Sequence, residues 1–160
     1  SQLNPEPCDD RIIMETFTDV PGTTLAELRS NLNFPDSPSE LNELDEFRIP
    51  INVADDYGVR VKGLLKAPET GTYYFWVTGD DNVELSLSTN ANEFNKVRIA
   101  YHDNWSRDGE WNKFITQKSA GIDLVAGQNY YIEALMNERG GGDNLSVGWR
   151  KPSNGDGTVP

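Results

Sequence analysis

The stretch YGVRVKGLLKAPETGTYYFWVTGDD, residues 57–81, determines the fold that the sequence predicts. Apolar and polar side chains alternate along residues 57–66, which is the period of a β-strand with one buried face. Residues 67–71 contain a proline and a glycine and are typical of a turn. An aromatic run at 72–78 predicts a second strand, so the centre of the chain is a strand, a turn and another strand.

Strand-like patterns recur on both sides of this stretch. They lie at residues 11–17, 47–50, 83–88, 96–101, 119–124, 129–136 and 145–150. The proline that ends the run 47–50 restricts it to the edge of a sheet. About nine short strands separated by turns predict an all-β protein, an antiparallel β-sandwich with short helical insertions. We expect Trp76 and Trp149, which lie within strands, to belong to its core.

One short helix is predicted at residues 22–29. Thr23 or Thr24 can cap its first turn. One face of the predicted helix carries three leucines, Leu25, Leu28 and Leu32. The following segment, 33–45, contains two prolines and several acidic residues, and we predict a loop there.

The composition limits the classes of function. A chain of 160 residues suits one domain, which would bury about 70% of the surface of the unfolded chain. The net charge of −12 and the isoelectric point of about 4.4 exclude a basic patch for nucleic acid or anionic membranes. No apolar run approaches about 18 residues, so no insertion into a membrane is predicted.

The two ends of the chain have the composition of linkers. Residues 1–9 and 152–160 are rich in Pro, Gly, Ser and Asn, which predicts a domain at 10–151 cut from a larger multidomain protein. The only cysteine, Cys8, lies in the first of these linkers, so no disulfide can form within the chain. Cys8 is a remnant, a free thiol or a link to another part of a longer chain.

Asp80 and Asp81 lie between two predicted strands. Two adjacent carboxylates repel each other and add nothing to packing, whereas Ca²⁺ takes several oxygen ligands, some of them charged. The loop 138–144 also lies between two strands, and its three glycines permit sharp turns that aim carbonyl groups inward. We therefore predict a Ca²⁺ site formed by the two loops. The alternative is a plain turn stabilised by Asp side chains, which is our interpretation of the identical pair at 55–56.

The same segments resemble the protective-antigen (PA14) domain family. Residues 57–77 are similar to its central pattern, in which an aromatic strand, a turn of the type A/P-P-x-x-G and a Y-x-F strand follow one another. Residues 25–35 resemble its L-x-x-L…F-P segment, and 126–149 resemble its G-x-x-Y-x-I-x-I…L-x-W segment. The resemblance covers roughly residues 10–151. It implies a β-sandwich of a kind found in sugar-binding adhesins and flocculins and as an accessory domain of glycosidases.

The resemblance also implies a site. In sugar-binding members an Asp-Asp pair joined by a cis peptide bond holds Ca²⁺ together with a second loop, and Asp80 and Asp81 match that pair. Arg139 stands near the position of the usual amide ligand. The second loop would therefore contribute other oxygen atoms, from the carbonyl group of Gly141 and from the side chain of Asp143 or Asn144.

Other residues are weaker candidates. Trp105 lies in a polar loop, where its indole could stack on a sugar ring or anchor the loop to the sandwich. His102 is the only histidine, which excludes a His-based metal site or catalytic triad. Nothing in the sequence positions the two acidic pairs that a glycosidase could use, Glu133 with Glu138 and Asp103 with Glu110. There is also no nucleophile elbow and no phosphate loop, so we do not predict an enzyme.

The sequence as a whole predicts a secreted or cell-surface lectin module that depends on calcium, recognises vicinal hydroxyls of a terminal sugar and serves adhesion. Its partners would be cell-surface glycans or polysaccharides. The predicted metal ligands are Asp80, Asp81, Gly141 and Asp143. The predicted sugar-binding residues are Asp80, Asp81, Asp143, Asn144 and Trp105. The alternatives are a substrate-targeting module of a secreted glycosidase and a structural or protein-binding sandwich without sugar activity.

Overall fold

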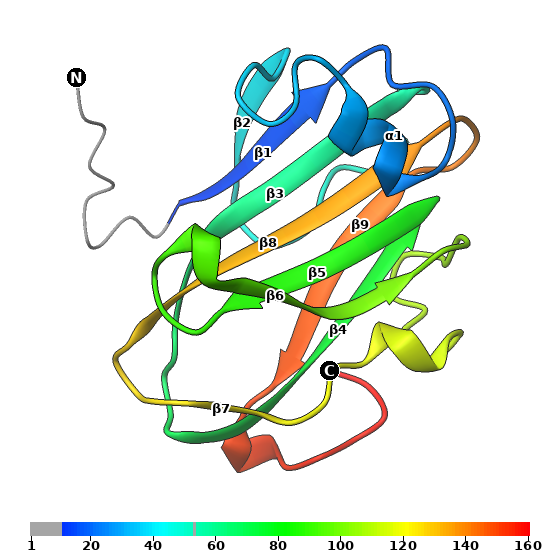
Figure 1. Ribbon diagram of the computed structural model, residues 1–160. Helices are drawn as coiled ribbons and strands as arrows, with labels where there is room; N and C mark the ends of the chain where they lie inside the picture. Colours follow the sequence, from blue (N-terminus) through cyan, green and yellow to red (C-terminus); the bar gives the residue numbers. More distant parts are fainter. Residues whose placement is uncertain (1–10, 53) are drawn as a thin grey trace, which may run out of the picture.

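The computed structural model describes residues 11–52 and 54–160. Cys8 and the linker predicted at 1–9 lie outside the described residues. The strands are β1 (Ile12–Phe17), β2 (Glu40–Leu44), β3 (Tyr57–Lys66), β4 (Gly71–Asp80), β5 (Asn82–Ser88), β6 (Lys96–His102), β7 (Ile122–Leu124), β8 (Asn129–Glu138) and β9 (Asn144–Arg150) (Figure 1). The helix is α1 (Leu25–Ser30), and the 3₁₀ turns are η1 (Glu93–Asn95), η2 (Ile115–Gln117) and η3 (Pro152–Asn154).

The strands form two sheets that face each other (Figure 1). One sheet has the order β2-β1-β3-β8-β5-β6, and the other has the order β7-β4-β9. All pairings within them are antiparallel, which confirms the predicted all-β sandwich. The two strands at the centre of the sequence, β3 and β4, lie in different sheets, so the turn between them connects the two layers.

The core lies between the two sheets. Because successive side chains of a strand point to opposite faces, every second residue of each central strand is available to fill it. The side chains at these positions are almost completely buried, among them Val59, Val61, Phe75, Val77, Ala134 and Met136. The period-2 pattern that predicted these strands therefore corresponds to burial between the two layers.

The two tryptophans expected in the core differ in burial: Trp149 is half-buried against the core, whereas Trp76 is fully buried outside the main core cluster. Trp149 packs against the core, with its ring centroid 5.5 Å from that of Tyr73. Trp76 is 0% exposed, but it lies on the face of β4 opposite to Phe75. There Lys118 covers it, with its Nζ 5.3 Å from the centroid of the indole.

Three expectations about the strands were wrong in detail. The segment 33–45 is not all loop, because its last part forms β2 against β1. Four of the five residues of β2 are exposed, so the strand has no buried face and no alternating pattern that would reveal it. The run 47–50 forms no strand, and only Arg48 makes an isolated bridge, to Ser146. The strand predicted at 119–124 is reduced to the three residues of β7.

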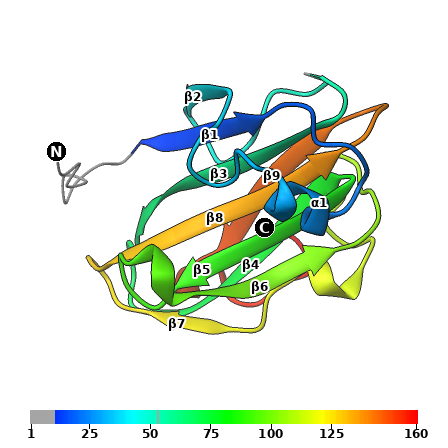
Figure 2. The same cartoon turned by 45° about the horizontal axis from the view of Figure 1, so that its top comes forward.

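Helix α1 begins at Thr24, which resolves the choice between two threonines. The Glu27 amide donates to Thr24 Oγ1 at 3.3 Å, and the Thr24 amide donates to Glu27 Oε2 at 2.8 Å, a reciprocal capping box. The helix covers one end of the outer face of the six-stranded sheet, where it packs on Phe17 and Leu135 (Figure 2). Within residues 11–52 and 54–160, no helix is long and apolar enough to cross a membrane.

The predicted leucine face of this helix is shorter than expected. Leu25 and Leu28 are buried, but Leu32 is fully exposed, because the helix ends at Ser30 and Asn31 is already extended (φ −64°, ψ 135°). Close packing under the helix depends on Gly58 of β3. A Cβ at that position would lie 2.5 Å from Cδ1 of Leu28, so the absence of a side chain lets the helix approach the sheet.

The residues after β9 contact the domain. The guanidinium of Arg150 donates to three carbonyl groups, those of Asn154, Gly155 and Val159, at 2.6, 3.1 and 3.2 Å. The division of the chain into a domain at 10–151 and a linker at 152–160 stays a prediction.

Candidate functional site

The predicted metal-binding residues lie at one end of the sandwich, where two strand connections meet. Asp81 alone separates β4 from β5, and its peptide bond to Asp80 is cis, as the family resemblance implied. The other connection joins β8 to β9. Asp80 pairs with Asn144, and Asn82 pairs with Asn137, so the two connections lie side by side.

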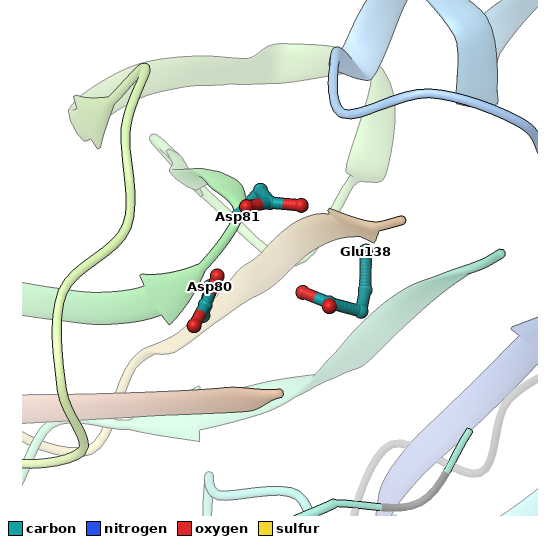
Figure 3. A group of neighbouring side chains, drawn as sticks. All are labelled: Asp80, Asp81 and Glu138. Atoms are coloured by element: carbon teal, nitrogen blue, oxygen red, sulfur yellow. The ribbon is translucent and has the colours of Figure 1, made fainter. Parts of the chain in front are cut away.

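Three carboxylates converge between these connections (Figure 3). One oxygen from each of Asp80, Asp81 and Glu138 lies within 4.8 Å of the other two, and these three residues are called the acidic cluster below. Two oxygens that bind one Ca²⁺ at 2.3–2.6 Å lie at most about 5 Å apart, so this spacing fits a shared ion. The cluster combines residues of both sheets, because Asp80 ends β4 and Glu138 ends β8.

Glu138 is the most unusual member of the acidic cluster. Its side chain is 0% exposed, and neither carboxylate oxygen has a hydrogen-bond partner among the described residues. A buried carboxylate normally has a paired charge or several donors. The arrangement therefore leaves two buried oxygen atoms available to a ligand.

The pKa values of the acidic cluster also favour the binding of a cation. Burial, together with the neighbouring carboxylates of Asp81 and Asp143, raises the pKa of Asp80 to about 7, while the charge of Lys113 opposes this rise. Burial, together with the charges of Asp81, Asp80 and Asp143, raises the pKa of Glu138 to about 8. Without a cation, the site favours protonated carboxyl groups. A divalent cation would reverse this, because its charge stabilises the ionised forms.

Asp143, the predicted side-chain ligand of the second loop, lies close to the acidic cluster and is 1% exposed. Its carboxylate accepts a hydrogen bond from the hydroxyl of Tyr57. Gly141, the predicted carbonyl ligand, is exposed with φ of +100°, a conformation that favours glycine. The loop therefore combines an exposed glycine segment with a buried acidic end.

Asn144 is the first residue of β9, directly opposite Asp80. It is 6% exposed, and its Nδ2 donates to the carbonyl oxygen of Ser106 at 2.8 Å. Its Oδ1 is buried and has no hydrogen-bond partner in the described part of the chain. The fixed amide thus presents a second uncommitted oxygen at this end of the sandwich.

Trp105 lies in the segment between β6 and η2 and is 41% exposed. The Nζ of Lys113 lies 3.4 Å from the centroid of a ring of Trp105 and donates to its carbonyl oxygen at 2.8 Å. The next residue, Ser106, accepts a hydrogen bond from Nδ2 of Asn144 at 2.8 Å, and Asn144 pairs with Asp80, which places this segment beside the acidic cluster. Trp105 therefore presents a partly exposed, fixed aromatic surface near the candidate ion site.

His102 is not part of the acidic cluster. It is 2% exposed, its Nε2 lies 2.9 Å from Ser106 Oγ, and burial lowers its pKa to about 4. One of the acidic pairs considered for catalysis, Glu133 with Glu138, does not converge either. Glu133 and Glu138 are five residues apart in β8 and therefore point to opposite faces of the sheet.

Glu138 is not among the metal ligands that the sequence predicts, because the sequence pattern places it in a loop, whereas β8 extends through it. Ala134 and Met136 fill the core, and Glu138 is the next residue of that inward-facing series. A charged residue that continues a buried series was the signal that could have identified it.

Comparisons with known sequences identify a matching domain family and several relatives. A sequence model described as the PA14 domain matches residues 21–160. The chain is 30% identical over 145 residues to the mouse N-acetyl-beta-glucosaminyl-glycoprotein 4-beta-N-acetylgalactosaminyltransferase 1. The aligned region covers 88% of this chain and 14% of that protein. It is 37% identical over 84 residues to human fibrocystin-L, covering 52% of this chain and 2% of that protein. The chain thus spans a small part of these relatives.

Similar solved structures support the fold. The PA14 domain of the MpAFP antifreeze protein has a TM-score of 0.67 at 15% identity, over 99% of this chain and 92% of that one. A PA14 sugar-binding domain from an RTX adhesin has a TM-score of 0.66 at 14% identity, over 90% and 91%. The Epithelial Adhesin 9 A domain of Candida glabrata, in complex with Galb1-4GlcNAc, has a TM-score of 0.63 at 16% identity, over 94% and 87%. With a family match over residues 21–160 and this fold, the chain belongs to the PA14 domain family.

Proposed function

We propose that this domain binds glycans through a Ca²⁺ ion held by the acidic cluster. The observation that carries the proposal is the convergence of three carboxylates, one of them fully buried and without a hydrogen-bond partner among the described residues. Ca²⁺ takes six to eight oxygen ligands and neutralises nearby carboxylates. The donors present are all oxygen atoms, which suits this ion better than zinc or copper.

Further ligands would come from the second loop. We propose the carboxylate of Asp143 and the carbonyl group of Gly141, with the Oδ1 of Asn144 as an additional acceptor. With the three carboxylates of the acidic cluster, these positions would supply six oxygen ligands, and two adjacent hydroxyls of a sugar would replace water in the last positions of a larger shell of about eight. When bound, the ion would supply a fixed positive charge that orients these hydroxyls. The protein itself would contribute the spacing of the ligands and the nearby indole of Trp105.

Sugar binding is supported by the relatives. An adhesin domain of similar fold was solved with a disaccharide, and another is described as sugar-binding. We propose a binding role and not catalysis, because the acidic cluster has the donor set of an ion site, and Glu133 lies on the opposite face of β8 from Glu138. Affinity for one sugar should be weak, about millimolar, because little surface is buried. Several copies in one chain or on one surface would compensate through multivalency.

The surroundings of the domain are also part of the proposal. The chain covers 14% and 2% of two curated relatives, so we propose that it works within a larger, secreted or cell-surface protein. An adhesin would use the site for attachment. A glycosidase would use the same site to hold its substrate near a separate catalytic domain.

A glycan array with and without calcium tests the proposal. We expect binding to glycans with accessible vicinal hydroxyls in millimolar CaCl₂ and no binding in excess EDTA. Asp80→Asn should abolish binding, whereas Asp36→Asn, which changes the same charge at an exposed residue of another loop, should not. Binding that persists in EDTA would contradict the ion-mediated site. A folded protein that binds calcium but none of the glycans would contradict the sugar-binding role.

A further inference from the structure

Tyr57 connects the hydrophobic core to the candidate ion site. It is the first residue of β3, and its side chain is 1% exposed within the main core cluster. Its hydroxyl nevertheless donates to Oδ2 of Asp143, which lies 86 positions later in the sequence. A tyrosine fixed on all sides by core packing thus presents its one polar atom to a carboxylate of the second loop.

The same part of the chain holds the backbone of that loop at both ends. The amide of Asn52 donates to the carbonyl oxygen of Asp143 at 3.3 Å, and the Asp143 amide donates to Oδ1 of Asn52 at 3.3 Å. At the other end, the Asp56 amide donates to the carbonyl oxygen of Arg139 at 3.0 Å. Between these anchors the three glycines at 140–142 are exposed. These hydrogen bonds hold Asp143 in place, whereas the glycines lie exposed between them.

We propose that Tyr57 is a positioning residue of the ion site, whose hydroxyl holds the carboxylate of Asp143 ready for the cation. This inference rests on the proposed Ca²⁺-dependent function. The hydroxyl engages the carboxylate of Asp143 at Oδ2 and so fixes the direction in which the carboxylate points. Tyr57 itself does not touch the ion.

The physical reason for this role is the repulsion between the carboxylate of Asp143 and the carboxylates of the acidic cluster. The negative charge of Asp143 lies close enough to Asp80 and Glu138 to raise the pKa of both. Without a donor, a buried carboxylate in this position would turn away from its neighbours or take up a proton. With the donor in place, binding requires less reorganisation, which is the general benefit of a second layer of contacts around a metal.

The test compares two tyrosine hydroxyls in the same core. Tyr57→Phe removes the donor to Asp143 and keeps the ring. Tyr73→Phe is the matched control, because Tyr73 is 0% exposed and its hydroxyl bonds to the carbonyl oxygen of Glu69 at 2.6 Å. Tyr73 also lies seven residues before Asp80 in β4, about 23 Å away along the strand. The two variants therefore lose the same group at opposite ends of the sandwich.

Calcium affinity is measured by titration calorimetry with CaCl₂ alone, after removal of metal. We expect Tyr57→Phe to weaken binding about tenfold, as the loss of a hydrogen bond to a charged group does. Tyr73→Phe should keep the wild-type affinity even where its melting temperature falls. In a double-mutant cycle, Tyr57→Phe should have no further effect on an Asp143→Ala background, which lacks the acceptor, because the two residues act through one contact.

Three results would overturn the proposal. Wild-type affinity in Tyr57→Phe would show that the hydroxyl is not needed, and equal losses in both tyrosine variants would show a general structural effect. Additive losses in the cycle would show that Tyr57 does not act through Asp143. If Tyr57→Phe fails to fold, Asn52→Gly removes the hydrogen bond that the Asp143 amide donates to the Asn52 side chain, and it suits the φ of +58° at that position. Wild-type affinity in that variant would equally contradict the need to position Asp143. A wild-type protein without calcium binding would refute the proposed function itself.

Discussion

Asp81 combines a structural role in the connection between two strands with a candidate role in binding the ion. It forms the whole connection between β4 and β5, its amide donates to the carbonyl oxygen of Asn137 at 3.0 Å, and its carboxylate accepts the amide of Arg139 at 3.2 Å. The same carboxylate is one of the three in the acidic cluster. Its backbone contacts stabilise the connection, whereas its charge is destabilising unless a cation is present.

Asp81→Asn should therefore change stability in opposite directions with and without calcium. In EDTA the variant should melt at the same or a higher temperature than the wild type, because one of the repelling charges is gone. In excess calcium it should melt lower, because its affinity for the ion should fall about tenfold or more. Differential scanning calorimetry in the two buffers measures both effects. A variant that melts lower than the wild type in EDTA would indicate a purely structural role.

His102 gives a prediction about pH. Its pKa is about 4 in the folded protein and about 6.5 in an unfolded chain, so between these values the unfolded chain binds more protons. The free energy of unfolding should fall as the pH drops from about 6.5 towards 4, and His102 should account for about 1–2 kcal/mol of the loss between pH 7 and pH 5.

Urea denaturation of the wild type and of His102→Gln at several pH values checks this. The variant lacks the titrating group, so the difference between the two proteins should shrink as the pH falls. The comparison also cancels the acidic groups, which titrate in the same range in both proteins. Parallel stability curves over the whole range would contradict the assignment.

Among the elements, α1 depends most on local sequence. With six residues it is too short to be stable alone, and its capping box and its two buried leucines hold it in place. Thr24→Ala removes the side-chain half of the box and should lower the free energy of unfolding by about 1 kcal/mol. Thr23→Ala, one residue earlier, is the control and should have a much smaller effect. Chemical denaturation measures both, and equal losses would mean that the cap contributes nothing specific.

The strands also show which elements a sequence reveals. β3 was predictable because apolar and polar side chains alternate along its sequence, and its apolar residues Val59 and Val61 lie in the core. β2 was not, because a strand with nearly all its side chains exposed has no such pattern. β2 forms because its backbone pairs with that of β1, and local sequence does not encode such a tertiary contact.

The candidate site was also predictable only in part from the sequence. Asp80 and Asp81 stand out because two charges interrupt an aromatic run, and the structure brings them together with Glu138. The contribution of Glu138 depended on where β8 ends, which sequence patterns locate poorly. The contacts of Asp143 with Asn52 and Tyr57 could not be predicted, because they join segments about 90 residues apart that only the sheet order brings together.

At the scale of the whole molecule, calcium should stabilise the fold. A ligand that binds only the folded state at 100 times its dissociation constant adds about 2.7 kcal/mol, or about 5–10 °C in melting temperature for a domain of this size. Thermal melts at increasing CaCl₂, with MgCl₂ at the same ionic strength as control, measure the shift. Identical melting temperatures in saturating calcium and in EDTA would count against the ion site.

The placement of the acidic cluster has a consequence for the lifetime of the fold. Asp80 ends a strand of the three-stranded sheet and Glu138 ends a strand of the six-stranded sheet, so an ion between them would add a link between the two layers beside the β4–β5 and β8–β9 connections. Such a link resists the first separation of the layers and so raises the barrier to unfolding as well as the equilibrium stability. Outside the cell, where proteases attack chains that open even briefly, the domain would then persist for as long as calcium is plentiful. In a compartment poor in calcium, the exposed glycines at 140–142 would become the place where it is first cleaved.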